Sequence, residues 1–426
     1  MKKMDYQNVR GTQDYLPEAE VIRREIRRTL EDVFIQYGCK PLETPILNYT
    51  ELMASKYGGG AEILQEMYTL SDRGERDLAL RYDLTIPFAK VIAMNPSIRM
   101  PFKRYEIGKV FRDGPIKTGR FREFTQCDVD IVGVDSQLAE AELMVMALDA
   151  FSKLDLQVTI QYNNRKLLTG MLELFRTPAD KVNKVILILD KLEKVGVQAV
   201  TSELAEQGLG EDTVQKIREF LTNSANTSYS YFETYSKQNG LIKEGHNELI
   251  ELDSYLNALG VKSQCLFNPF LARGLEIYTG TVYEIFLTNQ AITSSIGSGG
   301  RYDHAIGGLI GTNEDYSTVG ISFGLDVIYT AMCKKERIEE PYVDYYIVPL
   351  NTGRESLLIA QSLRSKGYKV ELEMGNKKLG KALEKANKEK IQRVIIVGAD
   401  EIAANEYRVK DMETGDEEVV EFNYNH

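Results

Sequence analysis

The chain has 426 residues, of which 43% are hydrophobic and 27% charged, as is typical of a soluble globular protein of about two to four domains. Its formal net charge of −11 excludes a strongly basic field that would coat DNA or RNA, although a local basic face could still bind RNA. The four cysteines and three histidines form no CxxC or Cys/His cluster, so neither a metal site nor a disulfide framework is expected.

The first twenty residues, MKKMDYQNVRGTQDYLPEAE, contain no apolar core of signal-peptide length. No run of about 18 apolar residues occurs elsewhere, so no transmembrane helix is expected. The sequence therefore predicts a cytoplasmic protein with no membrane partner.

An amphipathic helix is predicted over residues 17–37, because apolar residues recur there at helical spacing. Pro17 suits the first position of a helix, and Gly38 suits the residue that follows its end. The next segment, residues 39–47, contains two prolines, which indicates an extended strand at the edge of a sheet.

Several short segments with apolar or alternating patterns follow, separated by polar or glycine-bearing turns. Few helices lie between them, which favours an antiparallel sheet over a doubly wound parallel one. These segments are residues 77–81, 102–111, 128–132, 157–162, 281–287 and 318–323.

Residues 166–260 are rich in Leu, Glu and Lys at helical spacing, which indicates a helical insertion between residues 1–165 and residues 261–335 of the sheet domain. After the charged linker KKERIEEPYVD, apolar strands alternate with helical stretches, as in a small α/β domain over residues 342–426. The predicted class is α+β, with an antiparallel sheet domain, a helical insertion and a C-terminal α/β domain.

The richest motif is KVFRDGPIKTGRFREFTQCDVDIVG, residues 109–133, in which two strand-like stretches flank a cationic loop. Polyphosphate needs fixed cations, and arginine supplies a planar fork for its oxygens. An aromatic ring beside such cations can stack on adenine. A charged hairpin without a ligand is the alternative. The residues concerned are Arg112, Lys117, Arg120, Arg122 and Phe124.

Amide and acidic side chains follow on the second strand of this motif. Because side chains alternate along a strand, Gln126, Asp128 and Asp130 lie on one face. In the earlier segment LALRYDLTIPFAK, Asp83 and Thr85 alternate along a predicted extended run and could meet an ammonium group and an imidazole. A turn or a helix cap is the plainer interpretation of such a pair.

These two segments resemble class II aminoacyl-tRNA synthetases, and the stretches GRFREF and LRYDLTIPFA resemble the histidine–tRNA ligase family in particular, the second in its eukaryote-like form. In that family the 109–133 segment is motif 2. The resemblance implies that Arg112 binds the α-phosphate of ATP and the histidine carboxylate. It also implies an ATP site that includes Arg120, Arg122 and Phe124, and a histidine pocket that includes Asp83, Leu84, Thr85, Gln126 and Asp130.

LARGLEIYTGTVYEIF, residues 271–286, is similar to the family's R-G-L-D-Y-Y stretch. By this similarity Arg273 contacts ATP and histidine and stabilises the charge that develops on the α-phosphate. Ile277 and Tyr278 fall at histidine-binding positions, although Ile277 replaces a tyrosine. The glycines of SIGSGGRYDHAIG indicate a turn or a close approach to a ligand, and GGRYD matches a wall of the family's amino-acid pocket.

The segment STVGISFGLDVIYTAM, residues 317–332, resembles motif 3, which is a strand followed by glycines and a helix. The family's Gly-Leu-Glu-Arg, whose arginine holds the γ-phosphate of ATP, is replaced here by Gly-Leu-Asp-Val. Val327 cannot contact a phosphate, and loss of one charged contact should weaken binding by about 1.5–3 kcal/mol.

The last 85 or so residues resemble the family's anticodon-binding domain, which extends the likeness over nearly the whole chain. Within this part, a helix carries lysines at helical spacing, so that some of them share a face. A solvated helix face is the alternative to an RNA contact. The lysines are Lys377, Lys378, Lys381 and Lys385.

The resemblance implies a homodimeric histidine–tRNA ligase that uses ATP and Mg²⁺ to form histidyl-adenylate. Its partners would be L-histidine and tRNA(His), with no role for DNA, and the first long helix and the strand at Pro45 would pack across the dimer axis. Val327 and Ile277 favour instead a histidine-sensing regulatory subunit of ATP phosphoribosyltransferase, whereas the C-terminal domain and intact motif 2 oppose it. A paralogue that activates an amino acid without charging a tRNA is the third possibility.

Overall fold

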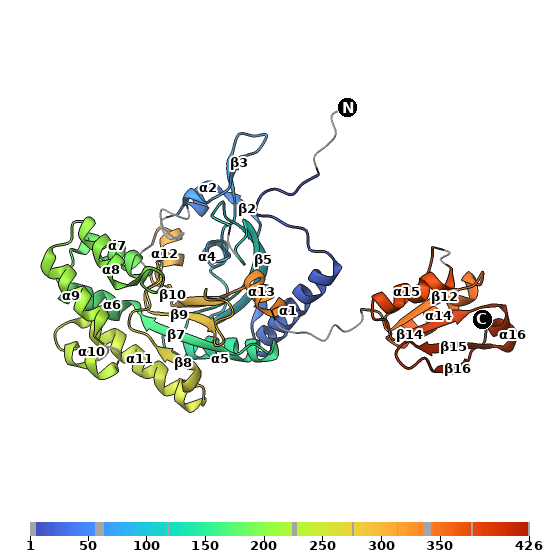
Figure 1. The fold of residues 1–426 in the computed structure, drawn as a ribbon. Helices are drawn as coiled ribbons and strands as arrows, with labels where there is room; N and C mark the ends of the chain where they lie inside the picture. The colour runs from blue at the N-terminus through green and yellow to red at the C-terminus, as the bar shows by residue number, and fades with distance from the viewer. Residues whose placement is uncertain are drawn as a thin grey trace. The chain divides into compact units, whose positions relative to one another are not determined.

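The chain forms two compact units, Met1–Lys335 and Glu336–His426, in a computed structural model (Figure 1). Each unit has hydrophobic clusters of its own. The structure describes residues 6–55, 64–116, 119–223, 228–274, 277–312, 314–334, 342–375 and 378–424.

An eight-stranded sheet forms the centre of the first unit, in the order β1-β5-β6-β11-β10-β9-β7-β8. At its two edges β1 pairs with β5 and β8 with β7 in parallel, whereas the pairings between them are antiparallel. The predicted antiparallel sheet is therefore confirmed. Its strands are β1 (Lys40–Pro41), β5 (Phe102–Phe111), β6 (Glu123–Val132), β7 (Val158–Asn164), β8 (Cys265–Phe267), β9 (Thr281–Leu287), β10 (Gly297–Arg301) and β11 (Thr318–Gly324).

Strand β10 was not among the predicted strands, because the glycines of this segment were interpreted as a turn or a close approach to a ligand. A Cβ atom on Gly299 would lie 2.0 Å from the carbonyl oxygen of Gly320 on β11 and 2.8 Å from the ring of Tyr283 on β9. The glycine composition therefore allows neighbouring strands to approach closely. Turn propensity is overridden by this packing.

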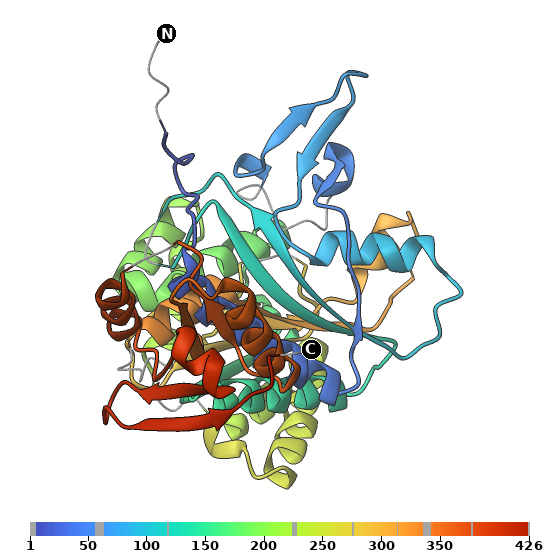
Figure 2. The same cartoon turned by 90° about the vertical axis from the view of Figure 1, so that its right-hand side faces the viewer.

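Helices cover the sheet on both sides, with α5 on one side and α4 on the other (Figures 1 and 2). The predicted first helix is α1 (Pro17–Gln36), and its apolar stripe, which includes Phe34, is buried against α5 (Leu138–Lys153) and α13 (Leu325–Cys333). The ring centroid of Phe323 on β11 lies 5.6 Å from that of Phe34 and 5.6 Å from that of Phe151. Burial of these rings fixes α1 to the sheet.

On the other side of the sheet, α4 (Thr85–Met94) packs against α12 (His304–Leu309) and a three-stranded sheet lies nearby. This small sheet has the order β2-β4-β3, and α2 (Thr50–Met53) contacts it. Its strands are β2 (Leu47–Tyr49), β3 (Thr69–Ser71) and β4 (Asp77–Leu80).

Thr85 corrects a second prediction, because it begins helix α4 and does not continue an extended run. The strand ends at Leu80, and the backbone N–H of Ile86 donates to Oδ1 of Asp83 at 3.2 Å. Asp83 thus satisfies one of the free N–H groups at the start of the helix, which is the capping role considered as the plainer interpretation.

The helical insertion is confirmed as a group of helices beside β7. Within this group α6 packs along α11, and glycines allow the two helices to approach closely. A Cβ atom on Gly245 would lie 2.7 Å from the backbone nitrogen of Leu167. The helices are α6 (Arg165–Leu174), α7 (Val182–Leu189), α8 (Leu192–Glu206), α9 (Glu211–Thr222), α10 (Tyr229–Tyr235) and α11 (Gly240–Ala258).

The second unit is a five-stranded sheet in the order β13-β12-β14-β15-β16, in which the first three strands are parallel. Three strands and the two longer helices match the predicted alternation, whereas the antiparallel pair β15–β16 was not predicted. Its strands carry exposed charged side chains instead of an apolar run. The elements are β12 (Tyr345–Pro349), α14 (Gly353–Ser365), β13 (Val370–Leu372), α15 (Leu379–Lys388), β14 (Arg393–Val397), α16 (Ala399–Ala404), β15 (Glu406–Asp411) and β16 (Glu417–Glu421).

Both units are built on sheets, and no helix in the described part of the chain has the length and apolar character needed to cross a membrane. In the second unit, alternate residues of β12 enter different clusters, with Ile347 in one and Tyr346 and Val348 in the other. Apolar side chains therefore cover both faces of this sheet.

Asp326, the acid of the motif 3 segment, joins four parts of the first unit. It accepts hydrogen bonds from the Arg23 guanidinium on α1 at 2.6 Å, from the Tyr15 hydroxyl at 2.6 Å and from the backbone N–H of Thr125 on β6 at 2.8 Å. The Arg23 and Asp326 side chains are 5% and 3% exposed. A buried ion pair of this kind is strongly destabilising when only one partner is removed.

We therefore expect Arg23→Ala to lower the free energy of unfolding by about 3–5 kcal/mol, because Asp326 would remain as a buried charge without its cation. Chemical denaturation measures this change. The control is Arg24→Ala on the same helix, where the side chain is 67% exposed and lies 3.4 Å from Glu20. It should leave the stability unchanged to within about 0.5 kcal/mol. Equal losses in both variants would contradict a special role for the buried pair.

Candidate active site

The site predicted from motif 2 is built around Arg112, which directly follows β5. Its Nε donates to the carbonyl oxygen of Tyr82 at 2.9 Å, and its guanidinium lies 5.3 Å from the ring centroid of Phe124. Burial raises the pKa of the neighbouring Asp83 to about 6, while the charges of Arg112 and Arg104 oppose this shift. The structure therefore brings Asp83, Arg112 and Phe124 together as predicted.

Strand β6 presents the second group of predicted residues, with Gln126, Asp128 and Asp130 at alternate positions. Nε2 of Gln126 donates to the Ser322 hydroxyl at 2.8 Å. Asp128 is 3% exposed, and burial raises its pKa to about 8. Burial also raises the pKa of Asp130, because its loss of solvation outweighs the effect of Arg104.

Arg104 on β5 is a residue of the site that the sequence did not reveal. It is fully buried, pairs with Oδ2 of Asp130 at 2.6 Å and donates to the carbonyl oxygen of Leu84 at 3.1 Å. Its guanidinium also lies 4.4 Å from the ring centroid of Phe88. The sequence could have pointed to Arg104, because it lies two residues before Glu106 on a predicted strand and this spacing puts both charges on one face.

Arg273 and Tyr278 form the third part of the site. Arg273 makes an ion pair with Glu284 on β9, and Tyr278 hydrogen-bonds to Arg273. Burial lowers the pKa of Arg112 and raises that of Tyr278, and the charge of Asp128 acts on both groups, so the residues from the three segments lie within electrostatic reach of one another. Ile277 is half-buried beside them.

The residues of the GGRYD segment point in different directions in the structure. The ring of Tyr278 packs against Gly300, where a Cβ atom would lie 2.9 Å from it, and the Tyr302 hydroxyl donates to Asp130. Arg301 instead makes a two-point contact with Glu140 on α5, with N–O distances of 2.6 and 2.8 Å. Arg301 therefore joins the sheet to a helix, and Tyr302 is the polar side chain of this segment that reaches the predicted pocket.

The predicted phosphate-binding cations of the motif 2 loop lie in different surroundings. Arg120 is exposed, whereas Arg122 pairs with Asp113 at 2.8 Å. Lys117 lies outside the described residues. Val327 packs beneath this loop, because a Cβ atom on Gly119 would lie 3.4 Å from its Cγ2. The loop and motif 3 thus meet at the position where the family carries its arginine.

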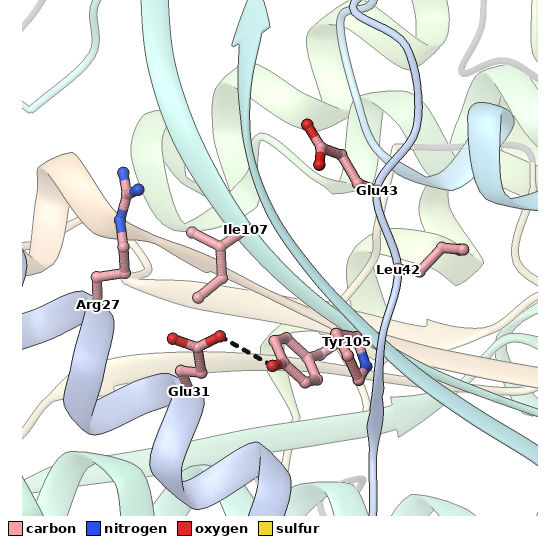
Figure 3. Close-up of a pocket in the computed structure, with 7 residues that line it drawn as sticks. Arg27, Glu31, Leu42, Glu43, Tyr105 and Ile107 are labelled. Carbon is pink, nitrogen blue, oxygen red and sulfur yellow. Dashed lines mark hydrogen bonds between the residues drawn. The ribbon is translucent and has the colours of Figure 1, made fainter.

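A pocket of about 430 Å³ lies apart from these residues, between α1, β5 and the segment that follows β1 (Figure 3). The Tyr105 hydroxyl donates to Glu31 at 2.8 Å within it. The pocket shares no residue with the predicted active site. It is lined by Arg27, Glu31, Pro41, Leu42, Glu43, Tyr105 and Ile107.

The lysines of the second unit do not form a uniform basic face. Lys385 makes an ion pair with Glu371 and lies 4.8 Å from the ring centroid of Tyr346. Lys378 and Lys381 are exposed, and Lys377 lies outside the described residues. The exposed pair is available for an RNA contact, whereas Lys385 has a structural partner.

Comparison with protein families gives two matches that together span most of the chain. Residues 11–328 match the family model described as histidyl-tRNA synthetase, and residues 344–424 match the one described as anticodon binding domain. The chain belongs to the histidyl-tRNA synthetase family. The resemblance carried by motif 2 and the LRYDLTIPFA stretch is thereby confirmed.

Curated members of the histidyl-tRNA synthetase family resemble the chain over its full length. It is 61% identical over 425 residues to histidine–tRNA ligase 2 of Shouchella clausii, with 100% of both chains covered. It is 57% identical to histidine–tRNA ligase 1 of Bacillus cereus, with 97% of each chain covered. The predicted regulatory-subunit alternative is not favoured by these relatives.

Solved structures agree with this membership. The crystal structure of histidyl-tRNA synthetase from Nostoc sp. PCC 7120 matches with a TM-score of 0.83 and 30% identity, covering 98% of this chain and 97% of that one. An ATP phosphoribosyltransferase regulatory subunit/histidyl-tRNA synthetase from Bacillus halodurans C matches with a TM-score of 0.76 but 20% identity, covering 93% and 100%. The second likeness shows the shared fold alone.

Proposed function

We propose that this chain is a histidine–tRNA ligase, which activates histidine with ATP and transfers it to tRNA(His) in the cytoplasm. The observation that carries the proposal is the row of Gln126, Asp128 and Asp130 on β6 beside Arg112 and Phe124, in a chain whose full-length relatives bear that name. A polar row of this kind suits an amino acid, and the arginine–aromatic pair suits a nucleotide.

In the first step, a carboxylate oxygen of histidine attacks the α-phosphorus of ATP, the bond to the β-phosphate oxygen breaks and pyrophosphate leaves. We assign Arg112 and Arg273 to the phosphate, whose charge they would stabilise in the transition state. Glu284 fixes the direction of the Arg273 guanidinium through its ion pair. In the second step, a hydroxyl at the 3′ end of the tRNA attacks the histidyl carbonyl carbon, and AMP leaves.

The histidine pocket is assigned to the residues around β6. Asp83 would bind the α-ammonium group, since Arg112 and Arg104 keep part of its negative charge available. Thr85, Leu84 and Tyr278 would complete the walls, and Ile277 offers an apolar contact where the family has a tyrosine. Alignment of the substrate carboxylate with the α-phosphorus would supply much of the rate enhancement.

Mg²⁺ would be bound chiefly through the phosphate oxygens of ATP. Among the described residues, no group of three or more His, Cys, Asp or Glu side chains could hold a metal ion. Magnesium commonly binds through substrate phosphates with few protein ligands, which is compatible with this arrangement.

We also propose four functional parts: residues 1–165 and 261–335 as the catalytic domain, residues 166–260 as its helical insertion and residues 342–426 as the anticodon-binding domain. The match of residues 344–424 to an anticodon binding domain supports the last assignment. Exposed Lys378 and Lys381 would contact the tRNA backbone.

Histidine-dependent exchange of pyrophosphate into ATP tests the first step, and charging of tRNA(His) with labelled histidine tests the second. We expect both activities, with other amino acids giving no exchange. No exchange at saturating ATP and histidine would refute the ligase and favour a histidine sensor. Exchange without charging would favour an amino-acid-activating paralogue instead.

Val327→Arg should lower the KM for ATP by about tenfold or more if the γ-phosphate lacks a cation at this position. The exchange assay measures this KM, and Val327→Met is the control for side-chain length because it adds no charge. Since Val327 lies against Gly119, both variants must shift the loop to a similar extent. An unchanged KM for ATP in Val327→Arg would mean that Arg120 or Arg122 already serves the γ-phosphate.

We propose a homodimer that buries the face formed by α1 and the strand near Pro45. Exposed apolar side chains lie on the strand near Pro45, with Leu47 46% and Tyr49 58% exposed. A pocket lies between α1 and the segment at Leu42 (Figure 3). Exposed apolar side chains that lie together are typical of a surface that another chain covers.

Light scattering should give twice the chain mass of 48.3 kDa, and a double variant with Leu47→Asp and Tyr49→Asp should give the monomer. The buried charges would have no partners in the dimer. The control is Leu266→Asp, since Leu266 is 49% exposed on β8 at the opposite edge of the large sheet. A monomeric wild type, or a dimer that survives the double variant, would disprove this interface.

A further inference from the structure

The N-terminal segment, residues 8–15, lies beside motif 2 although it is distant from it in sequence. It precedes α1 and includes a turn at Arg10 and Gly11. The carbonyl oxygen of Gly11 accepts a hydrogen bond from the backbone N–H of Arg122 at 2.8 Å. The carbonyl oxygen of Arg122 in turn accepts from the backbone N–H of Arg112 at 2.8 Å. Arg122 is thus held between the N-terminal segment and the residue around which the candidate site is built.

A β-turn gives Gly11 its conformation. The backbone N–H of Thr12 donates to the carbonyl oxygen of Val9 at 3.0 Å, and the Thr12 hydroxyl donates to the same oxygen at 2.9 Å. Gly11 is the third residue of this turn and has a φ of +87°. A positive φ at the third position is typical of type II turns, where glycine is favoured. The turn therefore fixes the place of Gly11 through hydrogen bonds of its own.

Gly11 lies in direct contact with the side chain of Arg122. A Cβ atom on Gly11 would lie 2.6 Å from Cγ, 2.8 Å from Cδ and 3.0 Å from Cβ of Arg122. These three atoms belong to the stem of the arginine side chain and not to its flexible end. A larger residue at Gly11 would therefore push the stem away and redirect the guanidinium. Glycine at this position thus sets the direction of Arg122.

The Arg122 guanidinium keeps donors for a further partner. Its Nη1 pairs with Oδ1 of Asp113 at 2.8 Å, and the arginine side chain is 28% exposed. Its Nε is buried and has no hydrogen-bond partner among the residues that the structure describes. A guanidinium carries its N–H donors in a planar fork that suits phosphate oxygens. Arg122 is therefore fixed at its stem, while its remaining donors can bind a phosphate.

The N-terminal segment is anchored at its other end by Tyr15. The Tyr15 hydroxyl donates to Asp326 at 2.6 Å, and the Arg23 guanidinium lies 3.7 Å from the centroid of the Tyr15 ring. The Tyr15 ring also meets the Tyr329 ring edge-on, with 6.0 Å between the centroids. Burial raises the pKa of Tyr15, so its hydroxyl stays protonated and remains a donor. These contacts fix the segment to α1 and α13, so Gly11 is supported from both sides.

We propose that the N-terminal segment belongs to the ATP site, where Gly11 directs the Arg122 guanidinium toward the phosphates. Gly11 is a positioning residue, because it acts through Arg122 and needs no contact with ATP itself. The inference rests on the proposed function, which assigns Arg122 to ATP. Val327 supplies no charge beneath the motif 2 loop, so the direction of Arg122 should matter more for ATP binding in this chain.

Gly11→Ala tests the contact in the histidine-dependent exchange assay. The KM for ATP should rise at least about tenfold, because the displaced arginine loses a charge-assisted hydrogen bond to a phosphate. The KM for histidine should stay within about twofold of wild type, since the proposed histidine pocket does not include Arg122. A KM for ATP within about twofold of wild type would overturn the proposal.

Gly260→Ala is the matched control for backbone strain. Gly260 follows α11 and has a φ of +72°, and a Cβ atom there would have no neighbour within 4 Å among the residues described. Alanine at this position imposes strain similar to that at Gly11 but makes no new contact. Both KM values should therefore stay within about twofold of wild type. An equal rise in the KM for ATP in the two variants would contradict the proposal.

A double-mutant cycle shows whether Gly11 acts through Arg122. Arg122→Ala removes Cγ and Cδ, the two atoms nearest to a Cβ atom on Gly11, and should itself raise the KM for ATP at least about tenfold. Gly11→Ala should then add less than about a twofold rise when Arg122 is already alanine. If the two effects multiply in full, Gly11 acts independently of Arg122, and the proposal is wrong.

Gly11→Asn separates the contact from the strain and keeps the test decisive if Gly11→Ala does not fold. Asparagine adopts a positive φ more readily than alanine, but its Cβ atom meets Arg122 equally closely. Thermal unfolding should therefore place Gly11→Asn between wild type and Gly11→Ala, while its KM for ATP rises as in the alanine variant. A wild-type KM for ATP in Gly11→Asn would show that the effect of alanine comes from strain, and the proposal would fail.

Direct binding of ATP separates this inference from the proposed function. If wild type gives no exchange, the ligase assignment fails, and the dissociation constant for ATP is measured by equilibrium dialysis instead. Weaker binding in Gly11→Ala, with wild-type binding in Gly260→Ala, supports the contact even without catalysis. Equal affinities in wild type and Gly11→Ala, or no binding of ATP to wild type, overturn it.

Discussion

The buried guanidinium of Arg104 joins the segments from which the candidate site is made. It contacts Asp130 on β6, the carbonyl oxygen of Leu84 before α4 and the ring of Phe88 on α4. A buried arginine needs anionic or carbonyl partners, and Asp130, Glu106 and the carbonyl oxygen of Leu84 supply them. Arg104 thereby allows acidic side chains to gather in the interior, where each alone would be strongly disfavoured. The same charge lowers the pKa of Asp83, Asp128 and Asp130 against the larger effect of burial.

The candidate site therefore combines several features that each lower the stability of the folded protein. Burial raises the pKa of three neighbouring acids, and within the described residues Oδ1 of Asp128 and Oδ2 of Asp130 have no hydrogen-bond partner, although the second pairs with Arg104. The large apolar core between the sheet, α1 and α5 supplies the stability that tolerates this arrangement. A ligand that brings hydrogen-bond donors and an anionic group would offset the unfavourable burial of these polar atoms. For this reason a buried cluster of acids indicates binding more strongly than a similar cluster on the surface.

The sequence predicted correctly those helices and strands that are determined by the local pattern of apolar residues. Helix α1 and strands β5, β9 and β11 were found within a residue or two because their apolar periodicity is continuous. Strand β10 was missed, since its glycines are explained by contacts with β9 and β11 that are distant in sequence. Thr85 was misplaced because Asp83 caps a helix there, and Arg104 was overlooked because its partners come from other segments. The motif 2 residues could be identified by family likeness, whereas the partners of Asp130, which are Tyr302 and Arg104, come from other strands and loops and depend on tertiary contacts.

Two neighbouring residues of motif 3, Asp326 and Val327, differ in their roles. Both carboxylate oxygens of Asp326 accept hydrogen bonds, from Arg23 and Tyr15 and from the backbone N–H of Thr125. These bonds fix helix α13 to α1 and β6. Loss of that acid would disturb β6, the strand that carries Gln126, Asp128 and Asp130. The next residue, Val327, has no such partners and lies under the motif 2 loop at Gly119. Under the proposed function, a change at Val327 would alter phosphate binding and leave the contacts of Asp326 in place. Arg120 and Arg122 lie close in sequence to Gly119 and could supply the charge that Val327 lacks. The proposed function would then separate the strength of ATP binding, set at this position, from the recognition of histidine.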